Sequence, residues 1–363
     1  MSDELFVIKP ETTVKPTPER PLVTFALFAY NQEDYIEEAI EGAFAQTYEP
    51  LEIILSDDCS TDKTFKIISD IGKKYSGPHR VVAIRNDHNL GVFNHFWTRC
   101  KQAKGDFIVV AAADDVSHPR RVAEHIRHYR NKSTYAVTSA YDLIDNKGKI
   151  LLRSVSKPLL SPSLHHNNYF FLSSPSDYVV IQGSTASYRK EVFSLQIPVI
   201  GKNVAEDTLM NFLIYANGGY VRFINDALIS YRQHEFALSN RSLDESKTRN
   251  FEVLEHQELA RNRRRFDTLA AYYWILDRCS AGGTINKEKI FIEKKYYEEK
   301  LNWEEKKIFN RSTSCLHSLV RLDLKLTVWK ALRLLGSVSN YQPRKLVFNF
   351  KNFVERTFRK FNA

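Results

Sequence analysis

The sequence has few cysteines and no long apolar run near its start. Its four cysteines show none of the spacings that mark zinc sites or disulfide frameworks: Cys59, Cys100, Cys279 and Cys315. Scattered cysteines of this kind suit a chain kept in a reducing cytoplasm. Residues 1–20 contain three prolines and no apolar core, so they predict a flexible arm and neither a signal peptide nor a membrane span.

Glycine is absent from the turn that follows the first expected strand. We expect that strand at 22–28, and the turn after it reads Ala29-Tyr30-Asn31-Gln32. A nucleotidyltransferase built on a similar sheet would need a glycine-rich loop here, because backbone N–H groups must approach the phosphates closely. This absence counts against that class of enzyme.

What is present is the composition of a soluble globular protein, with 43% hydrophobic and 26% charged residues. A chain of 363 residues has room for one domain of roughly 250 residues and an appendage. The net charge of +9 is uneven, because residues 306–363 hold 13 Lys and Arg against two acidic residues and so carry +11. The rest of the chain carries −2, so the basicity belongs to the C-terminal tail.

Short apolar segments alternate with amphipathic ones through the first third of the chain. We expect strands at 22–28, 51–56, 81–84 and 107–113, and helices near 36–44, 65–75 and 92–103. Strands that alternate with helices every 25–30 residues or so, as they do here, are typical of βαβ units in a parallel sheet. The expected fold class is therefore α/β, a Rossmann-like mixed sheet that is mostly parallel and flanked by helices.

The pattern continues less regularly to residue 240. We expect helices at 120–129 and 204–216 and strands at 135–141 and 220–231. Within 178–188 we expect a tight turn at 183–186 that leads into a strand. Residues 147–177 are polar and rich in Ser and Pro, and they predict an irregular loop that faces the substrate. Beyond residue 241 the pattern becomes helical and charged, which predicts a helical, basic C-terminal extension.

Two of the apolar strands end in paired aspartates, Asp57-Asp58 and Asp114-Asp115. Adjacent carboxylates repel each other, and a divalent metal with oxygen ligands is the usual compensation. Each pair alone also fits a turn or a helix cap. Because open α/β sheets bind ligands at the carboxyl ends of their strands, the two pairs together predict one shared polar site.

Five segments carry a family pattern in the right order: Pro21–Asn31, Ile53–Asp62, Gly105–Asp115, Ala205–Asp207 and Tyr231–His234. With them the chain resembles the family 2 glycosyltransferases, which have the GT-A fold, over residues 21 to about 240. The resemblance implies an inverting transfer of a sugar from a nucleotide-sugar donor, with a UDP-sugar favoured and a dTDP-sugar next. The implied acceptor is a glycan or lipid-linked saccharide in cell-surface polysaccharide biosynthesis.

The resemblance implies a metal on the donor diphosphate. Asp115 would bind Mn²⁺ or Mg²⁺, and His234 would supply a nitrogen ligand, a mixture that suits these metals better than zinc. Asp114 would accept hydrogen bonds from the ribose hydroxyls. His234 alone also fits an ordinary core or surface histidine.

Three further residues would hold the nucleoside. Asp58 would accept a hydrogen bond from the base, Tyr30 would stack on or cap the base, and Asn94 would line the same pocket. Alternatively, Tyr30 would be a buried core residue. The sequence departs from the family pattern at Cys59, where glycine is usual, and at Phe28, where a small polar residue is common. These departures bear on the base contacts and not on the fold.

Inversion requires a base that takes the proton of the attacking acceptor hydroxyl. The resemblance implies that this base is Asp207, near the start of a helix, and Glu206 is the neighbour that could exchange roles with it. Paired acids at a helix start have a simpler explanation, because they interact favourably with the helix dipole.

The tail at residues 344–361 has an amphipathic helical pattern. Its apolar arc holds Leu346, Val347, Phe350, Phe353, Val354, Phe358 and Phe361, and its basic arc holds Lys345, Lys351, Arg356, Arg359 and Lys360. This pattern predicts a helix that lies on an anionic membrane surface. The alternative is a helix docked on the catalytic domain. No nucleic-acid-binding module is recognised and the expected pocket is acidic, so we expect no nucleic-acid partner.

These observations divide the chain into three parts. We expect a flexible arm at 1–20, a GT-A catalytic domain at 21–240 and a helical region at 241–363. The nucleotide-binding half would be 21–118 and the acceptor half 119–240. The enzyme would be cytoplasmic and peripheral on the inner face of the plasma membrane. The alternatives are a nucleotidyltransferase and an inactive membrane-associated scaffold, and the intact aspartates argue against the scaffold.

Overall fold

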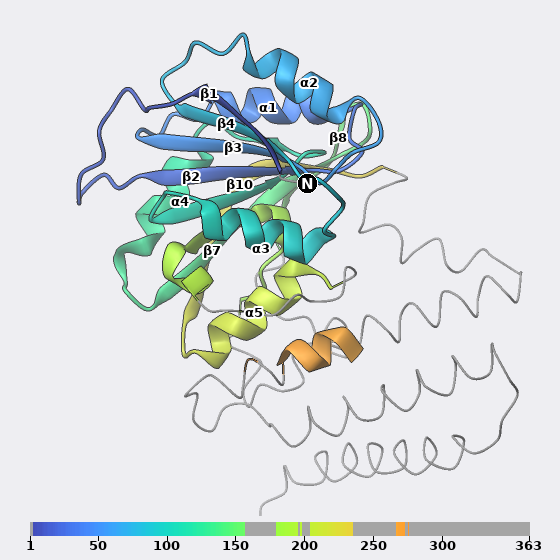
Figure 1. Cartoon of the computed structure of the whole chain (residues 1–363). Helices are drawn as coiled ribbons and strands as arrows, with labels where there is room; N and C mark the ends of the chain where they lie inside the picture. Colours follow the sequence, from blue (N-terminus) through green and yellow to red (C-terminus); the bar gives the residue numbers. More distant parts are fainter. Residues whose placement is uncertain are drawn as a thin grey trace, which may run out of the picture. The chain divides into compact units, whose positions relative to one another are not determined.

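A computed structural model describes residues 3–156, 179–194, 197, 204–234, 266–272 and 275 (Figure 1). The chain divides into two units, and the sheet lies in the first, which comprises Met1–Gln257 and Ala270–Lys287. The tail at 344–361 and nearly all of the expected C-terminal extension lie outside the described residues. Within the described ranges, each helix is too short or too polar to cross a bilayer.

Four parallel strands and three connecting helices form the first half of the sheet. The strands are β2 (Val23–Ala29), β3 (Leu51–Asp57), β4 (Arg80–Arg85) and β5 (Phe107–Ala112), and the helices are α1 (Ile36–Phe44), α2 (Thr64–Gly72) and α3 (Val92–Gln102). α1 and α2 lie on one face of the sheet and α3 lies on the other (Figure 1). The expected βαβ units are therefore confirmed.

The core of this half follows from the apolar pattern. All seven residues of β3 are buried, as expected for a central strand covered on both faces. α1 buries Ile36, Ala39, Ile40 and Ala43, the positions whose spacing predicts the helix. The polar residues that follow these apolar strands therefore lie at the ends of the strands, outside the apolar core.

The second half of the sheet is mixed, with three short strands that run antiparallel to their neighbours. Its strands are β6 (Val116–Ser117), β7 (Thr134–Ile144), β8 (Ile150–Val155), β9 (Ala186–Arg189) and β10 (Tyr220–Arg232). The strand order is β1-β4-β3-β2-β5-β9-β7-β10-β6, with β8 paired to β7. β9 is antiparallel to both β5 and β7, and β10 is parallel to β7. The carboxyl ends of β2, β3, β5, β7 and β10 consequently share one edge, which we call the carboxyl edge.

Helices complete this half. They are α4 (Arg121–Arg127), α5 (Glu206–Ala216) and the short 3-10 turns η1 (His128–Arg130), η3 (Gly183–Thr185) and η4 (Lys190–Ser194). α5 lies on the same face as α3 (Figure 1). Tyr272 stacks on Phe212 of α5 with ring centroids 3.9 Å apart. The helices expected at 120–129 and 204–216 are thus confirmed to within a few residues.

Two strands differ from the expectation. Residues 1–20 are predicted as a flexible arm, yet β1 (Glu4–Lys9) pairs antiparallel with β4 at the end of the sheet. Residues 147–177 are predicted as an irregular loop, yet β8 lies within them. Both strands are held mainly by backbone pairing and expose most of their side chains, so they carry no alternation of buried and exposed residues for a sequence pattern to reveal.

Candidate active site

The acidic pair after β5 stands at the carboxyl edge. Asp115 is buried, and its Oδ1 accepts a hydrogen bond from the backbone nitrogen of Arg232 at 2.9 Å. Its Oδ2 is buried too and accepts no hydrogen bond of ordinary geometry from the described part of the chain, although the Ser184 hydroxyl lies beside the carboxylate. Burial, and then the neighbouring charge of Asp114, raise the pKa of Asp115 to about 8.

His234 follows β10 and reaches the same acidic pair. Its Nε2 lies 3.0 Å from Oδ2 of Asp114, and the histidine is buried. The expected ligands Asp115 and His234 are thus brought to one place, and the imidazole Nε2 contacts Asp114, the neighbour of Asp115. The described residues contain no cluster of three or more His, Cys, Asp or Glu side chains able to hold a metal by themselves.

These residues fit a divalent ion that shares its coordination with a ligand. Mg²⁺ and similar ions are commonly held by one or two carboxylates together with substrate phosphates. Asp115 offers such a carboxylate, because its buried Oδ2 is short of partners and its pKa is raised. A bound cation would favour the ionised form that burial opposes.

Arg121, a buried arginine that the sequence did not single out, donates hydrogen bonds to segments near the carboxyl edge. Arg121 Nη2 donates to the carbonyl oxygens of Val110 and Ser184, each at 2.6 Å, and Nη1 donates to Ser117 Oγ at 2.9 Å. The guanidinium is fully buried, and its charge lowers the pKa of Asp115 part of the way. Arg121 thereby joins β5 to the turn η3.

Asp58 is buried and organises the loop before α3. Its Oδ1 accepts hydrogen bonds from Asn86 Nδ2 at 2.6 Å and from the backbone of Leu90 at 2.8 Å. Its Oδ2 accepts one from the backbone of Gly91 at 3.0 Å. The expected contact with a base would therefore be additional to three hydrogen bonds that already fix this carboxylate within the fold.

Tyr30 and Asn94 come from segments next to the one that holds Asp58. Tyr30 directly follows β2, whose last residue pairs with Asp57, and its side chain is 44% exposed, which excludes the alternative place in the core. Asn94 donates from Nδ2 to the carbonyl of Leu90 at 3.2 Å, within the loop that Asp58 organises. All three expected nucleoside residues thus come from neighbouring segments.

Another acidic pair, Glu206 and Asp207, begins α5. Asp207 Oδ1 accepts a hydrogen bond from the backbone of Thr208 at 2.6 Å. Burial raises the pKa of Asp207, while hydrogen bonds from Thr208 and the Gly183 backbone lower it part of the way. Burial and the Asp207 charge raise the pKa of Glu206 to about 8. The pair therefore retains a proton at a higher pH than two isolated carboxyl groups would.

The turn η3 lies between the pair Asp114-Asp115 and the pair Glu206-Asp207. The sequence did not reveal this relationship. A Cβ atom at Gly183 would lie 2.1 Å from Glu206 Oε1, so glycine lets this carboxylate lie against the turn. The next residue, Ser184, lies beside the Asp115 carboxylate. Adjacent residues of one turn thus contact the candidate metal ligand and the candidate base.

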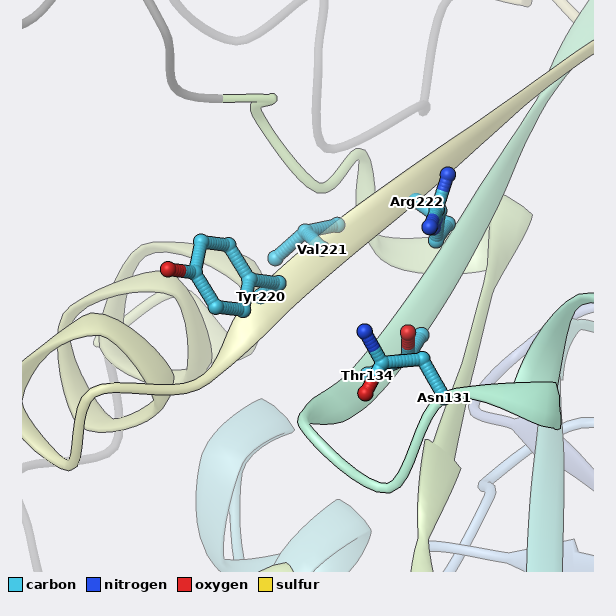
Figure 2. A pocket seen from close by; sticks show the side chains of 5 residues that line it. All are labelled: Asn131, Thr134, Tyr220, Val221 and Arg222. Carbon is cyan, nitrogen blue, oxygen red and sulfur yellow. The ribbon is translucent and has the colours of Figure 1, made fainter.

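A hollow elsewhere on the sheet does not contain these residues. It has a volume of about 300 Å³ and is lined by Asn131, Thr134, Tyr220, Val221 and Arg222 (Figure 2). It lies at the amino ends of β7 and β10, opposite the carboxyl edge. The chemistry-bearing side chains are at the carboxyl edge, so we place the candidate active site there.

Comparison with known proteins bears on the family and the fold. Residues 24–195 match the model of the family described as Glycosyl transferase family 2. An uncharacterized glycosyltransferase of Haemophilus influenzae is 28% identical over 222 residues, which cover 59% of this chain and 66% of that protein. The UDP-Glc:alpha-D-GlcNAc-diphosphoundecaprenol beta-1,3-glucosyltransferase WfaP of Escherichia coli is 32% identical over 120 residues, 33% of this chain and 46% of that protein.

These matches span less than two thirds of each relative's own length. Among solved structures, S. aureus TarS 1-349 in complex with UDP-GlcNAc is similar with a TM-score of 0.51 and 14% identity, covering 83% of this chain and 79% of that one. At this identity the similarity concerns the fold, which is that of the GT-A glycosyltransferases. Residues 24–195, just under half of this chain, are thus similar to glycosyl transferase family 2.

Proposed function

We propose that the chain is an inverting glycosyltransferase that uses a nucleotide-sugar donor and a divalent metal, with a UDP-sugar favoured and a dTDP-sugar second. The observation that carries this proposal is the state of Asp115, a buried carboxylate at the carboxyl edge with one oxygen short of partners. The donor class rests on the match of residues 24–195 to the family model and on the relative whose name specifies UDP-Glc.

Each expected site residue has a role in donor binding. Asp115 and His234 would hold Mn²⁺ or Mg²⁺, which would neutralise the departing diphosphate. Asp114 accepts hydrogen bonds from the ribose while its Oδ2 remains against His234. Tyr30 covers the base, and Asp58 with Asn94 shapes the loop on its other side.

Asp207 would act as the base for the acceptor hydroxyl. The acceptor oxygen attacks the anomeric carbon and loses its proton to the carboxylate, while the bond from that carbon to the diphosphate breaks and the nucleoside diphosphate leaves with the electron pair. Hydrogen bonds from Thr208 and Gly183 favour ionised Asp207, whereas a backbone hydrogen bond at Glu206 itself opposes the raised pKa of Glu206. Asp207 is therefore the better base of the two.

The acceptor we propose is a glycan or a lipid-linked saccharide in cell-surface polysaccharide synthesis. The Escherichia coli relative has a diphosphoundecaprenol-linked acceptor in its name. The amphipathic pattern at 344–361 supports a peripheral position on an anionic membrane, on the cytoplasmic side where nucleotide sugars are present.

A donor screen tests the proposal directly. The purified full chain is mixed with UDP-, dTDP- or GDP-sugars, with and without Mn²⁺, and thermal stabilisation and release of nucleoside diphosphate are measured. We expect stabilisation that needs both metal and one donor class, with slow release of the diphosphate. Release of pyrophosphate from a nucleoside triphosphate would instead establish the nucleotidyltransferase. A chain that binds none of these nucleotides would support the scaffold.

A further inference from the structure

Arg232, the last residue of β10, carries a charge that is almost completely buried, with 1% of the residue exposed. A buried guanidinium is costly unless its donors are paired. The partners of Arg232 therefore indicate what the residue contributes. They lie in the candidate active site, in and just before α1, and in the turn between β7 and β8.

The residue holds the acidic pair from two sides. Its backbone nitrogen donates to Asp115 Oδ1 at 2.9 Å, and its side-chain Nε donates to the carbonyl oxygen of Asp114 at 2.9 Å. One residue thereby fixes both the Asp115 carboxylate and the peptide group between the two aspartates. Neither contact uses the buried Asp115 Oδ2, which stays available for a cation.

The far end of the guanidinium connects this pair to α1. Nη2 lies 2.5 Å from Glu38 Oε2, and the Glu38 side chain is 57% exposed. Nη1 lies 3.4 Å from each of the carbonyl oxygens of Asp145 and Asn146, in the turn between β7 and β8. The guanidinium thus joins three segments around the carboxyl edge.

The ring of Tyr35 lies close to both Arg232 and His234, the expected nitrogen ligand. The guanidinium carbon of Arg232 lies 4.9 Å from the ring centre of Tyr35, and that ring lies 4.8 Å from the His234 imidazole. Tyr35 therefore packs against both the cation and the imidazole. His234 itself is held against Asp114 at 3.0 Å.

We propose that Arg232 is a positioning residue that sets Asp114, Asp115 and His234 in the geometry for a metal-bound donor diphosphate. This inference rests on the proposed function. The role depends on the planar guanidinium with its several donors. A lysine would keep the charge, but its single nitrogen could make only some of these contacts. Residues that orient metal ligands typically change metal affinity or activity by about 10–100-fold when they are replaced.

Binding measurements on the full chain test the assignment. UDP is titrated into wild type, Arg232→Lys and the matched control Arg153→Lys, once with Mn²⁺ and once with a chelator. Arg153 is an exposed arginine 3.5 Å from Asp142. We expect Arg232→Lys to weaken binding by about 10–100-fold with Mn²⁺ and to leave metal-free binding unchanged. A purely structural role would weaken both, and Arg153→Lys should change neither.

The outcomes separate the two proposals. Wild type that binds UDP with Mn²⁺, together with Arg232→Lys that binds within about twofold of it, overturns the assignment of Arg232 alone. Wild type without metal-dependent UDP binding overturns the proposed function and this inference with it. Should Arg232→Lys unfold at the assay temperature, Glu38→Gln decides, because it breaks the ion pair at a half-exposed partner. A metal-selective loss there supports the assignment, and unchanged binding refutes it.

Discussion

The Oδ2 atom of Asp58 accepts a hydrogen bond from the backbone nitrogen of Gly91 at 3.0 Å and so joins the end of β3 to the start of α3. Gly91 has a φ of 79°, a conformation that favours glycine. With the further bonds to Leu90 and Asn86, the carboxylate determines where this loop runs along the carboxyl edge.

The first prediction concerns the stability of this loop. Asp58→Asn replaces one acceptor oxygen with an amide nitrogen, so at least one buried donor loses its partner. We expect the free energy of unfolding to fall by about 1–3 kcal/mol in denaturant titration. UDP affinity should fall as well, because the loop leads into α3, where Asn94 donates a hydrogen bond to the carbonyl oxygen of Leu90. Asp70→Asn, at an exposed pair with Lys66, is the control and should cost little. Unchanged stability would show that the bonds of Asp58 contribute nothing net.

The second prediction concerns the metal. Asp115→Asn keeps the shape of the side chain and removes the charge, so Mn²⁺-dependent UDP binding should disappear in calorimetric titration. The fold should survive, because burial and Asp114 already oppose the ionised form of this side chain and raise its pKa to about 8. A melting temperature close to that of wild type checks this point. If the variant binds UDP and Mn²⁺ as tightly as wild type, Asp115 is not a metal ligand.

Much of the fold could be predicted because its strands are covered on both faces. β3 and β5 are apolar runs that end in polar residues, so the sequence predicts both the strands and the acidic groups at their ends. β1 and β8 expose most of their side chains and could not be recognised in this way. What holds them is backbone pairing, which leaves no trace in the order of apolar and polar residues.

The site could be predicted only in part, for a related reason. Side chains at strand ends are visible in the sequence, but their partners come from distant segments. Arg120 and Arg121 are adjacent and chemically identical, yet Arg120 is exposed and Arg121 is buried against β5 and η3. The donors to Asp58 lie about thirty residues further along the chain, at 86–91. Such pairings depend on how the segments pack, which a residue pattern does not state.

The third prediction concerns the tail at 344–361, which lies outside the described residues. Its large apolar side chains contribute roughly 1 kcal/mol each to insertion at an interface, and its Lys and Arg about 1 kcal/mol each near anionic lipid. A chain truncated before Arg344 should still fold and bind UDP but should no longer sediment with anionic vesicles. High salt should weaken the binding of the intact chain without abolishing it, because the apolar contribution is not screened. Unfolding of the truncated chain would instead place the helix in the core.

The fourth prediction follows from the pKa of Glu206, which burial and Asp207 raise from 4.5 to about 8. Between these values the folded chain holds a proton that the unfolded chain has lost. Stability due to this group is therefore greatest at low pH and declines as pH rises toward 8. Glutamine does not titrate and resembles the protonated form of Glu206. The melting temperature of Glu206→Gln should therefore fall less between about pH 5 and pH 8 than that of wild type. Parallel pH profiles for the two proteins would contradict the raised pKa.

The last prediction separates the two acids at the start of α5. Asp207→Asn removes the proposed base and should lower the rate of transfer by about 10²–10⁴-fold, because nothing then accepts the proton of the acceptor hydroxyl. Donor affinity should remain near that of wild type, since Asp207 contacts Thr208 and Gly183 and takes no part in holding Asp115. Glu206→Gln is the matched control and should retain most of the activity. Single-turnover measurements with saturating donor distinguish the chemical step from binding. Near-normal transfer by Asp207→Asn with an inactive Glu206→Gln would assign the base to Glu206.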